Sequence, residues 1–145
     1  MTDPDPFASD RGRMLSEHLA GRGIRCPRVL SALEQVPRHQ FVAAGQQHLA
    51  YQDQALGIDC GQTISQPYIV AAMSQALDLA ADHLVLEIGT GSGYQAAVLS
   101  PLVNEVYTIE IVNRLGRRAE RTLKKLGYEN IHLRRGDGFL GWPEA

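Results

Sequence analysis

The sequence predicts an α/β protein that contains the first half of a doubly wound parallel sheet. Three observations carry the prediction. The apolar run 83–88 is typical of a strand buried on both faces, and a glycine-rich turn and a helix follow it. Two more strand-like runs, 105–110 and 130–135, flank a helical pattern at 113–126. Strand, turn and helix in alternation form parallel βαβ units, and we expect the strand order 3-2-1.

The chain before this sheet is predicted to be helical. Glycines end a helix that starts near residue 10, and prolines bound a second helix at 27–36. A further helical turn is expected at 38–42, followed by an irregular region at 43–62. We therefore divide the single domain into a helical region, residues 1–80, and a sheet region, residues 81–145.

A third helix is expected from Pro67 to Leu77, directly before the first strand. Its inner face is predicted to carry Ile69, Ala72, Met73 and Leu77. Ser65 stands at the N-cap position, where serine is a preferred residue. The residues alone favour this capping role, but the Ser65 hydroxyl could instead face a ligand.

The glycine-rich turn is spaced for a ligand other than a dinucleotide. Its glycines stand at positions 89, 91 and 93, whereas the fingerprint G-x-G-x-x-G needs its third glycine where Tyr94 stands. The acidic Glu87 would repel a phosphate but suits a ligand that carries an ammonium group. S-adenosylmethionine, with its adenosine, sulfonium and amino-acid tail, is such a ligand. A nicotinamide-dependent oxidoreductase is the least favoured enzyme class.

Acidic side chains follow the second and third predicted strands. Glu110 ends the second strand, where a carboxylate accepts hydrogen bonds from ribose hydroxyls; an ordinary exposed glutamate is the alternative. Asp137 follows the third strand and could accept a hydrogen bond from an adenine amino group or simply form a turn. Asn113 is predicted to cap the helix 113–126, whose basic side chains indicate a solvated face rather than an RNA-binding one.

Composition narrows the class of protein. The 145 residues are 44% hydrophobic and carry a net charge of −2, which favours neither nucleic acid nor a membrane surface as a partner. The N-terminus lacks the features of a signal peptide, so we expect a cytoplasmic protein. We also expect a monomer. The two cysteines are expected to stay reduced. The five histidines match no metal-binding spacing, and we predict no metal site.

Three stretches resemble the protein-L-isoaspartate O-methyltransferase family: Thr63–Pro67, Leu86–Tyr94 and Gly136–Gly138. The first is a signature specific to that family, and the second is the cofactor loop that many methyltransferases share. The match runs from about the first helix to the last residue. The resemblance implies a Rossmann-like methyltransferase sheet with S-adenosyl-L-methionine as cofactor. It also implies that the α-carboxylate of L-isoaspartyl residues in aged proteins and peptides is methylated, which is a repair reaction.

The resemblance assigns roles to site residues as well. It makes Ser65 an active-site residue beside the point of methyl transfer. It assigns cofactor contacts to Gln62, Thr63, Ile64, Ser65, Glu87, Gly89, Gly91, Gly93, Glu110, Ile111, Asp137 and Gly138. Because the substrate carboxylate is ionised at neutral pH, the reaction needs no general base, and we expect Ser65 to act as a positioning hydroxyl.

Family members continue well beyond the match to residues 142–145, so we expect this sequence to be a fragment without the C-terminal strands. The strand 83–88 would then be an open apolar edge. One alternative function is a non-catalytic remnant that binds a nucleoside or a partner protein through this edge. A methyltransferase for another substrate is a second alternative, and the signature at 63–67 argues against it.

Overall fold

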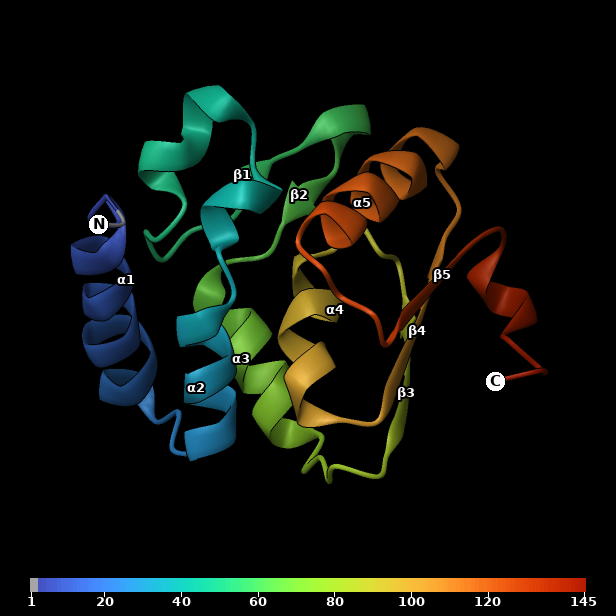
Figure 1. Ribbon diagram of the computed structural model, residues 1–145, viewed down its shortest axis with the longest axis horizontal. Helices are drawn as coiled ribbons and strands as arrows, with labels where there is room; N and C mark the ends of the chain where they lie inside the picture. Colours follow the sequence, from blue (N-terminus) through green and yellow to red (C-terminus); the bar gives the residue numbers. More distant parts are fainter. Residues whose placement is uncertain (1–2) are drawn as a thin grey trace.

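The computed structural model describes residues 3–145 as helices packed against a small parallel sheet (Figure 1). Strands β3 (Leu84–Ile88), β4 (Glu105–Glu110) and β5 (Ile131–Arg135) lie side by side in the order β3-β4-β5, and both pairs are parallel. Helices α4 (Tyr94–Leu99) and α5 (Asn113–Lys125) connect them and cover one face of the sheet. The predicted parallel βαβ units are therefore confirmed.

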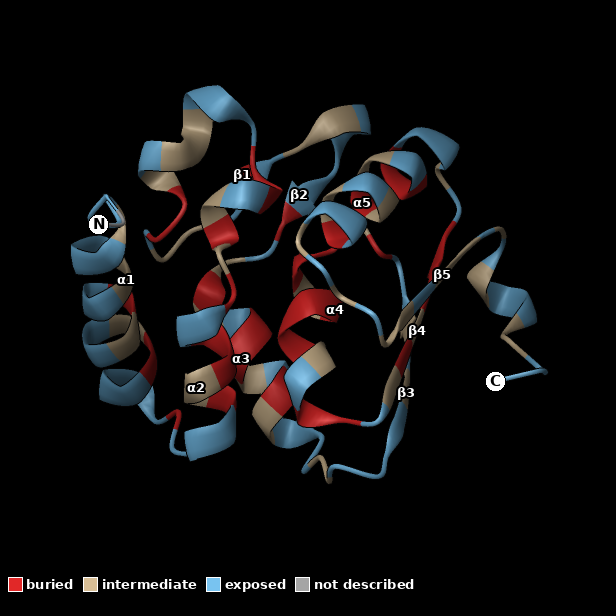
Figure 2. Ribbon diagram, viewed as in Figure 1, coloured by how far each residue is buried: buried red, intermediate tan, exposed pale blue. Residues whose placement is uncertain are grey.

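Helix α4 forms the centre of the core (Figure 2). All of its residues except Gln95 are buried, and they pack with Val106 of β4. A short 3₁₀ turn, Ser100–Leu102, follows α4 and leads into β4. The other face of the sheet carries the C-terminal segment, where Trp142 packs against the ring of Tyr107 with 5.1 Å between the ring centroids. This segment includes the 3₁₀ turn Gly138–Leu140.

The N-terminal helices form as predicted, with one change in hydrogen bonding. Helix α1 (Ala8–Arg13) continues into a π-helical segment, Met14–Leu19, and a 3₁₀ turn, Ala20–Arg22. Gly23 then ends the helix in the left-handed conformation, with a φ of 96°. Helix α2 (Pro27–Gln35) begins at the predicted proline and ends just before Pro37.

The region between α2 and α3 consists of short turns and one small hairpin. The expected helical turn is confirmed as a 3₁₀ turn, Arg38–Phe41, and two more 3₁₀ turns span Ala44–Leu49 and Asp59–Gly61. Strands β1 (Leu56–Gly57) and β2 (Thr63–Ile64) pair antiparallel. The sequence did not predict this hairpin, because two residues are too few to display an alternating pattern.

Helix α3 (Pro67–Ala76) corrects two predictions. Its N-cap is Gln66, so Ser65 does not cap it. Its buried face contains Val70, Ala71 and Ser74, whereas the predicted inner residues Ile69, Met73 and Leu77 are exposed. The helix packs against α2 and α4 through its smaller residues. The larger apolar side chains Met73 and Leu77 line a cavity beside β3 instead.

Two further predictions are wrong, one about the start of helix α5 and one about strand β3. The N-cap of α5 is Val112, and no side chain caps the helix. Asn113 is its first helical residue. Strand β3 lies at the edge of the three-stranded sheet and is not buried on both faces, because the face onto which its alternate side chains Leu84, Leu86 and Ile88 point is exposed. Leu84, Leu86 and Ile88 are 54%, 46% and 57% exposed.

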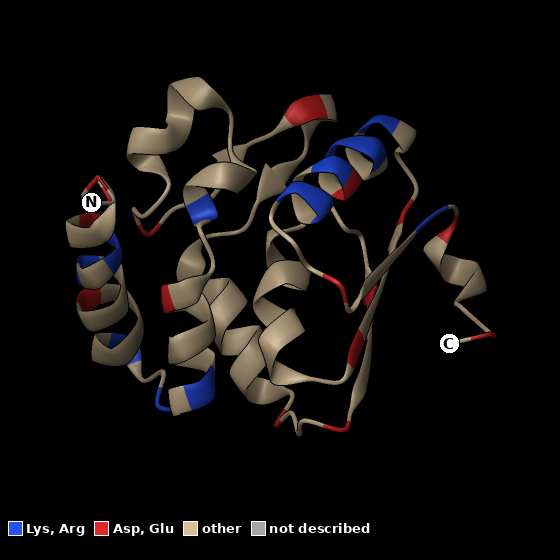
Figure 3. Ribbon diagram, in the orientation of Figure 1, with Lys and Arg blue, Asp and Glu red and all other residues tan. Residues whose placement is uncertain are grey.

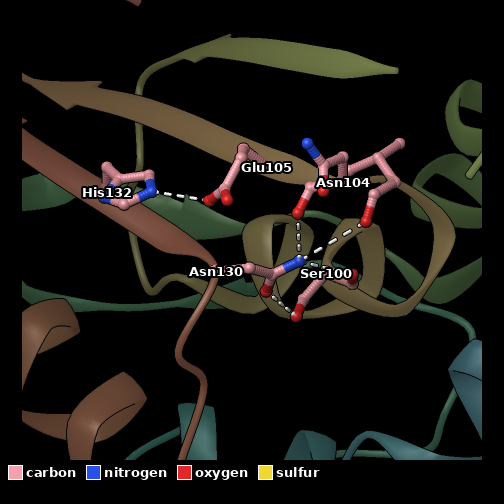
Figure 4. A network of polar contacts seen from close by, with 6 residues as sticks. Ser100, Asn104, Glu105, Asn130 and His132 are labelled. Carbon is pink, nitrogen blue, oxygen red and sulfur yellow. Dashed lines mark hydrogen bonds and ion pairs between the residues drawn. The ribbon is translucent and has the colours of Figure 1, made fainter. Parts of the chain in front are cut away.

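A polar network joins the amino ends of the strands (Figure 4). The amide nitrogen of Asn130 donates to the carbonyls of Ser100 and Asn104 at 2.9 and 3.1 Å, and its oxygen accepts from Ser100 Oγ at 2.5 Å. Nearby, Glu105 pairs with His132 at 2.7 Å across β4 and β5. These contacts fix the end of the sheet opposite the glycine-rich turn.

None of the helices within residues 3–145 has the length and apolar character needed to span a lipid bilayer. The same part of the chain contains no group of three or more His, Cys, Asp or Glu side chains that could hold a metal ion.

Candidate active site

A cavity of about 370 Å³ opens beside β3 and the glycine-rich turn. Thr63, Ile64 and Ser65 line one side of it, and Glu87, Gly89 and Gly91 line another. The apolar wall between them comes from β3, α3 and α4 and includes Leu86, Ile88, Val70, Met73, Leu77 and Leu99. The structure thus brings the signature segment and the glycine-rich turn to one cavity, although more than twenty residues separate them in sequence.

The three glycines of the turn all adopt backbone conformations that disfavour other residues. Gly89, Gly91 and Gly93 have φ values of 91°, 56° and 90°. A Cβ atom at Gly93 would also lie 3.4 Å from the side chains of Ala119 and Leu123 on α5. The turn can therefore pass close under a ligand while α4 and α5 pack tightly behind it.

Glu110 connects the glycine-rich turn to the end of β4. One carboxylate oxygen accepts from the Gly91 N–H at 2.8 Å, and the other accepts from the Val112 N–H at 2.9 Å. The side chain is only 5% exposed. Glu110 is not among the residues that line the cavity, but its hydrogen bonds hold the glycine-rich turn, which does line it. Each oxygen can accept a further hydrogen bond, so Glu110 could still bind ribose hydroxyls. That binding stays a prediction.

Glu87 belongs to a hydrogen-bonded chain that the sequence reading missed. Thr108 donates its hydroxyl to a Glu87 carboxylate oxygen at 2.6 Å, and the Thr90 and Thr108 hydroxyl oxygens lie 2.6 Å apart. Burial raises the pKa of Glu87 to about 7, helped by the charge of Glu110 and opposed by the bond from Thr108. A carboxyl with this pKa is close to half ionised at neutral pH, and a cation in the cavity would favour the ionised form.

Ser65 is exposed in the cavity, and its side chain makes no hydrogen bond to another described residue. Its carbonyl oxygen accepts from Arg38 Nη2 at 2.9 Å. The hydroxyl is therefore free to meet a bound molecule, which is the alternative to capping that the sequence left open.

Six of the predicted site residues do not line the cavity: Gln62, Gly93, Glu110, Ile111, Asp137 and Gly138. The Gln62 carbonyl accepts from the Ile58 N–H at 2.8 Å, and Ile111 is 67% exposed. Asp137 is the N-cap of the 3₁₀ turn Gly138–Leu140 and accepts from the Phe139 N–H at 2.9 Å. A Cβ atom at Gly138 would overlap Ile88, so this segment packs against the end of β3.

Comparison with known proteins gives the family. A model of the family described as Protein-L-isoaspartate(D-aspartate) O-methyltransferase (PCMT) matches residues 10–145. The chain belongs to this family.

Relatives in the family are more than half identical to the chain. It is 55% identical over 140 residues to the protein-L-isoaspartate O-methyltransferase of Synechococcus sp. (strain JA-2-3B'a(2-13)), with 97% of this chain and 57% of the relative covered. It is 59% identical over 131 residues to protein-L-isoaspartate O-methyltransferase 2 of Pelobacter propionicus, with 90% and 58% covered. The chain thus spans somewhat under two thirds of the length of these relatives.

Solved structures of the family share the fold. A protein-L-isoaspartate O-methyltransferase superposes with a TM-score of 0.84 at 31% identity, covering 92% of this chain and 44% of that chain. A Plasmodium falciparum structure assigned to the same family, in complex with S-adenosyl-L-homocysteine, has a TM-score of 0.75 over 97% of this chain and 67% of that chain. At 22% identity the second likeness supports the fold alone. The resemblance read from the sequence is confirmed.

Proposed function

We propose that the chain carries the methyl-transfer site of a protein-L-isoaspartate O-methyltransferase, with S-adenosylmethionine bound over the glycine-rich turn. One observation carries the proposal: the family signature at Ser65 and the acidic glycine-rich turn at Glu87 line the same cavity. Membership of the family supports the same reaction.

The cavity lining fits the proposed cofactor. The exposed apolar side chains of α3 and β3 suit an adenosine or a thioether chain, whereas Glu87 suits an ammonium group. Glu110 is the proposed acceptor for ribose hydroxyls, and Ile111, Asp137 and Gly138 are proposed at the adenine end. Gln62, Thr63 and Ile64 complete the proposed contacts on the substrate side.

The bound cofactor would supply a methyl group on a positively charged sulfur. Transfer of this methyl group to an isoaspartyl carboxylate oxygen would form a carbon–oxygen bond, break the carbon–sulfur bond and leave S-adenosylhomocysteine with an uncharged sulfur. No proton moves, so the chain needs no general base. Its task is to align the oxygen with the methyl group and to exclude water, and the Ser65 hydroxyl is the proposed group that orients the carboxylate.

The wider setting is part of the same proposal. Residues 1–80 form the proposed substrate side and residues 81–145 the cofactor side of one domain, whose sheet we propose to be part of the doubly wound methyltransferase sheet. The proposed partners are proteins and peptides with L-isoaspartyl residues, bound by a monomer and without nucleic acid. The free cysteines Cys26 and Cys60 are compatible with the reducing cytoplasm.

The test is methyl transfer from labelled S-adenosylmethionine to an isoaspartyl peptide, with the matching aspartyl peptide as control. The chain is assayed alone and with the C-terminal region of its Synechococcus relative joined to it. The proposal is supported if either protein methylates the isoaspartyl peptide and does not methylate the aspartyl peptide. Transfer by neither, despite binding of S-adenosylhomocysteine by calorimetry, would favour a non-catalytic nucleoside-binding role.

A further inference from the structure

Arg38 is a buried cation that the proposed reaction does not use directly. It stands in the 3₁₀ turn after α2, its side chain is 0% exposed, and no described carboxylate forms an ion pair with it. Burial of an arginine costs several kcal/mol unless specific contacts compensate for the lost hydration. Burial correspondingly lowers the pKa of Arg38. The contacts that compensate for this cost therefore indicate the structural role of the Arg38 side chain.

The guanidinium group of Arg38 joins three segments that are distant in sequence. Its Nε donates to the Ala50 carbonyl at 2.6 Å, and its Nη2 donates to the Ser65 carbonyl at 2.9 Å. Its Cζ lies 4.8 Å from the centroid of the Tyr94 ring, which is a cation–π contact. Two donors of one planar group thus face two carbonyls, while its central carbon lies over an aromatic ring.

Two of these segments line the same cavity. Ser65 precedes α3 and presents its hydroxyl to the cavity, and no other described side chain fixes that hydroxyl. Tyr94 is the first residue of α4 and directly follows the last glycine of the turn. The same guanidinium group therefore contacts the backbone of the substrate side and the residue that ends the cofactor side.

We propose that Arg38 is a positioning residue for methyl transfer, because it fixes the backbone of Ser65 at a set distance from the glycine-rich turn. This inference rests on the proposed function. Lysine cannot replace Arg38, since a single ammonium group lacks the planar fork that reaches two carbonyls from separate nitrogens. A shift of about 1 Å between reacting groups costs on the order of 100-fold in rate.

Arg28 provides a matched control. It also donates to two backbone carbonyls, those of Leu79 at 2.7 Å and Leu102 at 2.6 Å. Its bonds join α2 to the segments that follow α3 and α4, and it does not line the cavity. Arg28 is exposed whereas Arg38 is buried, but its loss likewise removes two arginine–carbonyl bonds, and it does so without touching Ser65.

The experiment compares Arg38→Met, Arg38→Lys and Arg28→Met with the unsubstituted chain, each joined to the same C-terminal region and assayed below its unfolding temperature. We expect both Arg38 variants to lose about 100-fold in kcat, while the KM for S-adenosylmethionine changes less than about threefold. Amide exchange at residues 63–66 should become at least about tenfold faster. Arg28→Met should keep its kcat within about threefold, even where its thermal midpoint falls equally.

Chemical rescue separates positioning from general stability. Guanidinium at low millimolar concentration should restore part of the kcat of Arg38→Ala and none of any deficit in Arg28→Ala. Equal losses of kcat in the Arg28 and Arg38 variants, or full activity in Arg38→Lys, would overturn the inference. If the unsubstituted protein transfers no methyl group, the proposed function fails. A positioning role in methyl transfer then fails with it, and the exchange contrast at residues 63–66 shows only whether Arg38 fixes the backbone of Ser65.

Discussion

Glu87 shows how a single side chain couples the stability of the fold to its site. Its half-buried carboxyl group lines the cavity and accepts a hydrogen bond from Thr108, and burial raises its pKa to about 7 from 4.5. The folded chain therefore binds this proton more tightly than the unfolded chain does. The contribution of this bound proton to the free energy of unfolding is complete below about pH 4.5 and is lost as the pH rises through about 7.

We expect Glu87→Gln to flatten this pH dependence. The amide oxygen can still accept the bond from Thr108, but the side chain no longer ionises. Between pH 5 and pH 8 the unsubstituted chain should lose about 2–3 kcal/mol of unfolding free energy relative to the variant. Urea unfolding at pH 5, 6.5 and 8 measures the difference. A constant offset between the two proteins across this range would contradict the raised pKa.

Ser65 gives a second prediction at this scale. Its hydroxyl lines the cavity but bonds to no other described residue, so its removal should leave the fold intact. We expect Ser65→Ala to lower kcat by about 10- to 100-fold and to change the affinity for S-adenosylhomocysteine less than about threefold. Steady-state kinetics and calorimetry measure the two quantities. Equal losses in both would assign Ser65 to cofactor binding instead.

At the scale of elements, the sequence predicted where helices and strands lie along the chain better than which of their faces are buried. The strand Glu105–Glu110 and the start of α2 at Pro27 are as predicted, because β-branched runs and prolines act locally. The buried face of α3 was wrong, since the choice between two apolar stripes depends on which neighbours are present.

The candidate site follows the same division. Glu87 and the glycines were found from local spacing, but the roles of Thr108 and Arg38 depend on contacts between distant segments. A buried arginine also runs against the usual expectation for charged residues, so no pattern in the sequence singles out Arg38.

Asn130 tests how the connections between elements hold the sheet. Its side chain serves the carbonyls of Ser100 and Asn104 and the Ser100 hydroxyl (Figure 4). We expect Asn130→Ala to cost about 2–3 kcal/mol of unfolding free energy, because these partly buried groups lose their partner. The affinity for S-adenosylhomocysteine should not change, since the network lies at the opposite end of the strands.

Asn104→Ala is the matched control for this network. The exposed Asn104 takes part through its backbone carbonyl, and no side-chain bond of it is found in the described part of the chain. Chemical denaturation should therefore detect a change below about 0.5 kcal/mol. A loss as large as that of Asn130→Ala would show that the site tolerates no truncation, whatever its hydrogen bonds.

At the scale of the whole molecule, charge and apolar surface are distributed unevenly. Basic residues gather on α5 (Figure 3), where Arg118 pairs with Asp59 at 3.1 Å. Most of the large exposed apolar side chains lie along β3 and on or next to α3, and the others are Ile111, Phe139 and Leu140. The cavity lies between these two apolar elements, so a bound ligand would cover part of that surface.

The core crosses the boundary between the helical region and the sheet region. Residues from α2, α3, α4 and β4 belong to one buried cluster, and Phe41 packs edge-on against Tyr94 with 5.6 Å between ring centroids. Gln95 on α4 also donates to Ser74 on α3 at 2.9 Å. Neither region can bury its apolar residues without the other.

We therefore expect residues 1–80 and 81–145 to unfold as one cooperative unit. The slowest amides of α2 and of β4 should exchange with the same free energy, equal to that of global unfolding in urea. A separate peptide of residues 1–80 should lack stable helix by circular dichroism, because Leu33 and Phe41 would lose the apolar partners that α4 provides. A higher exchange free energy in β4 than in α2, or a folded 1–80 peptide, would instead establish two independent folding units and move the proposed substrate side outside the cooperative core.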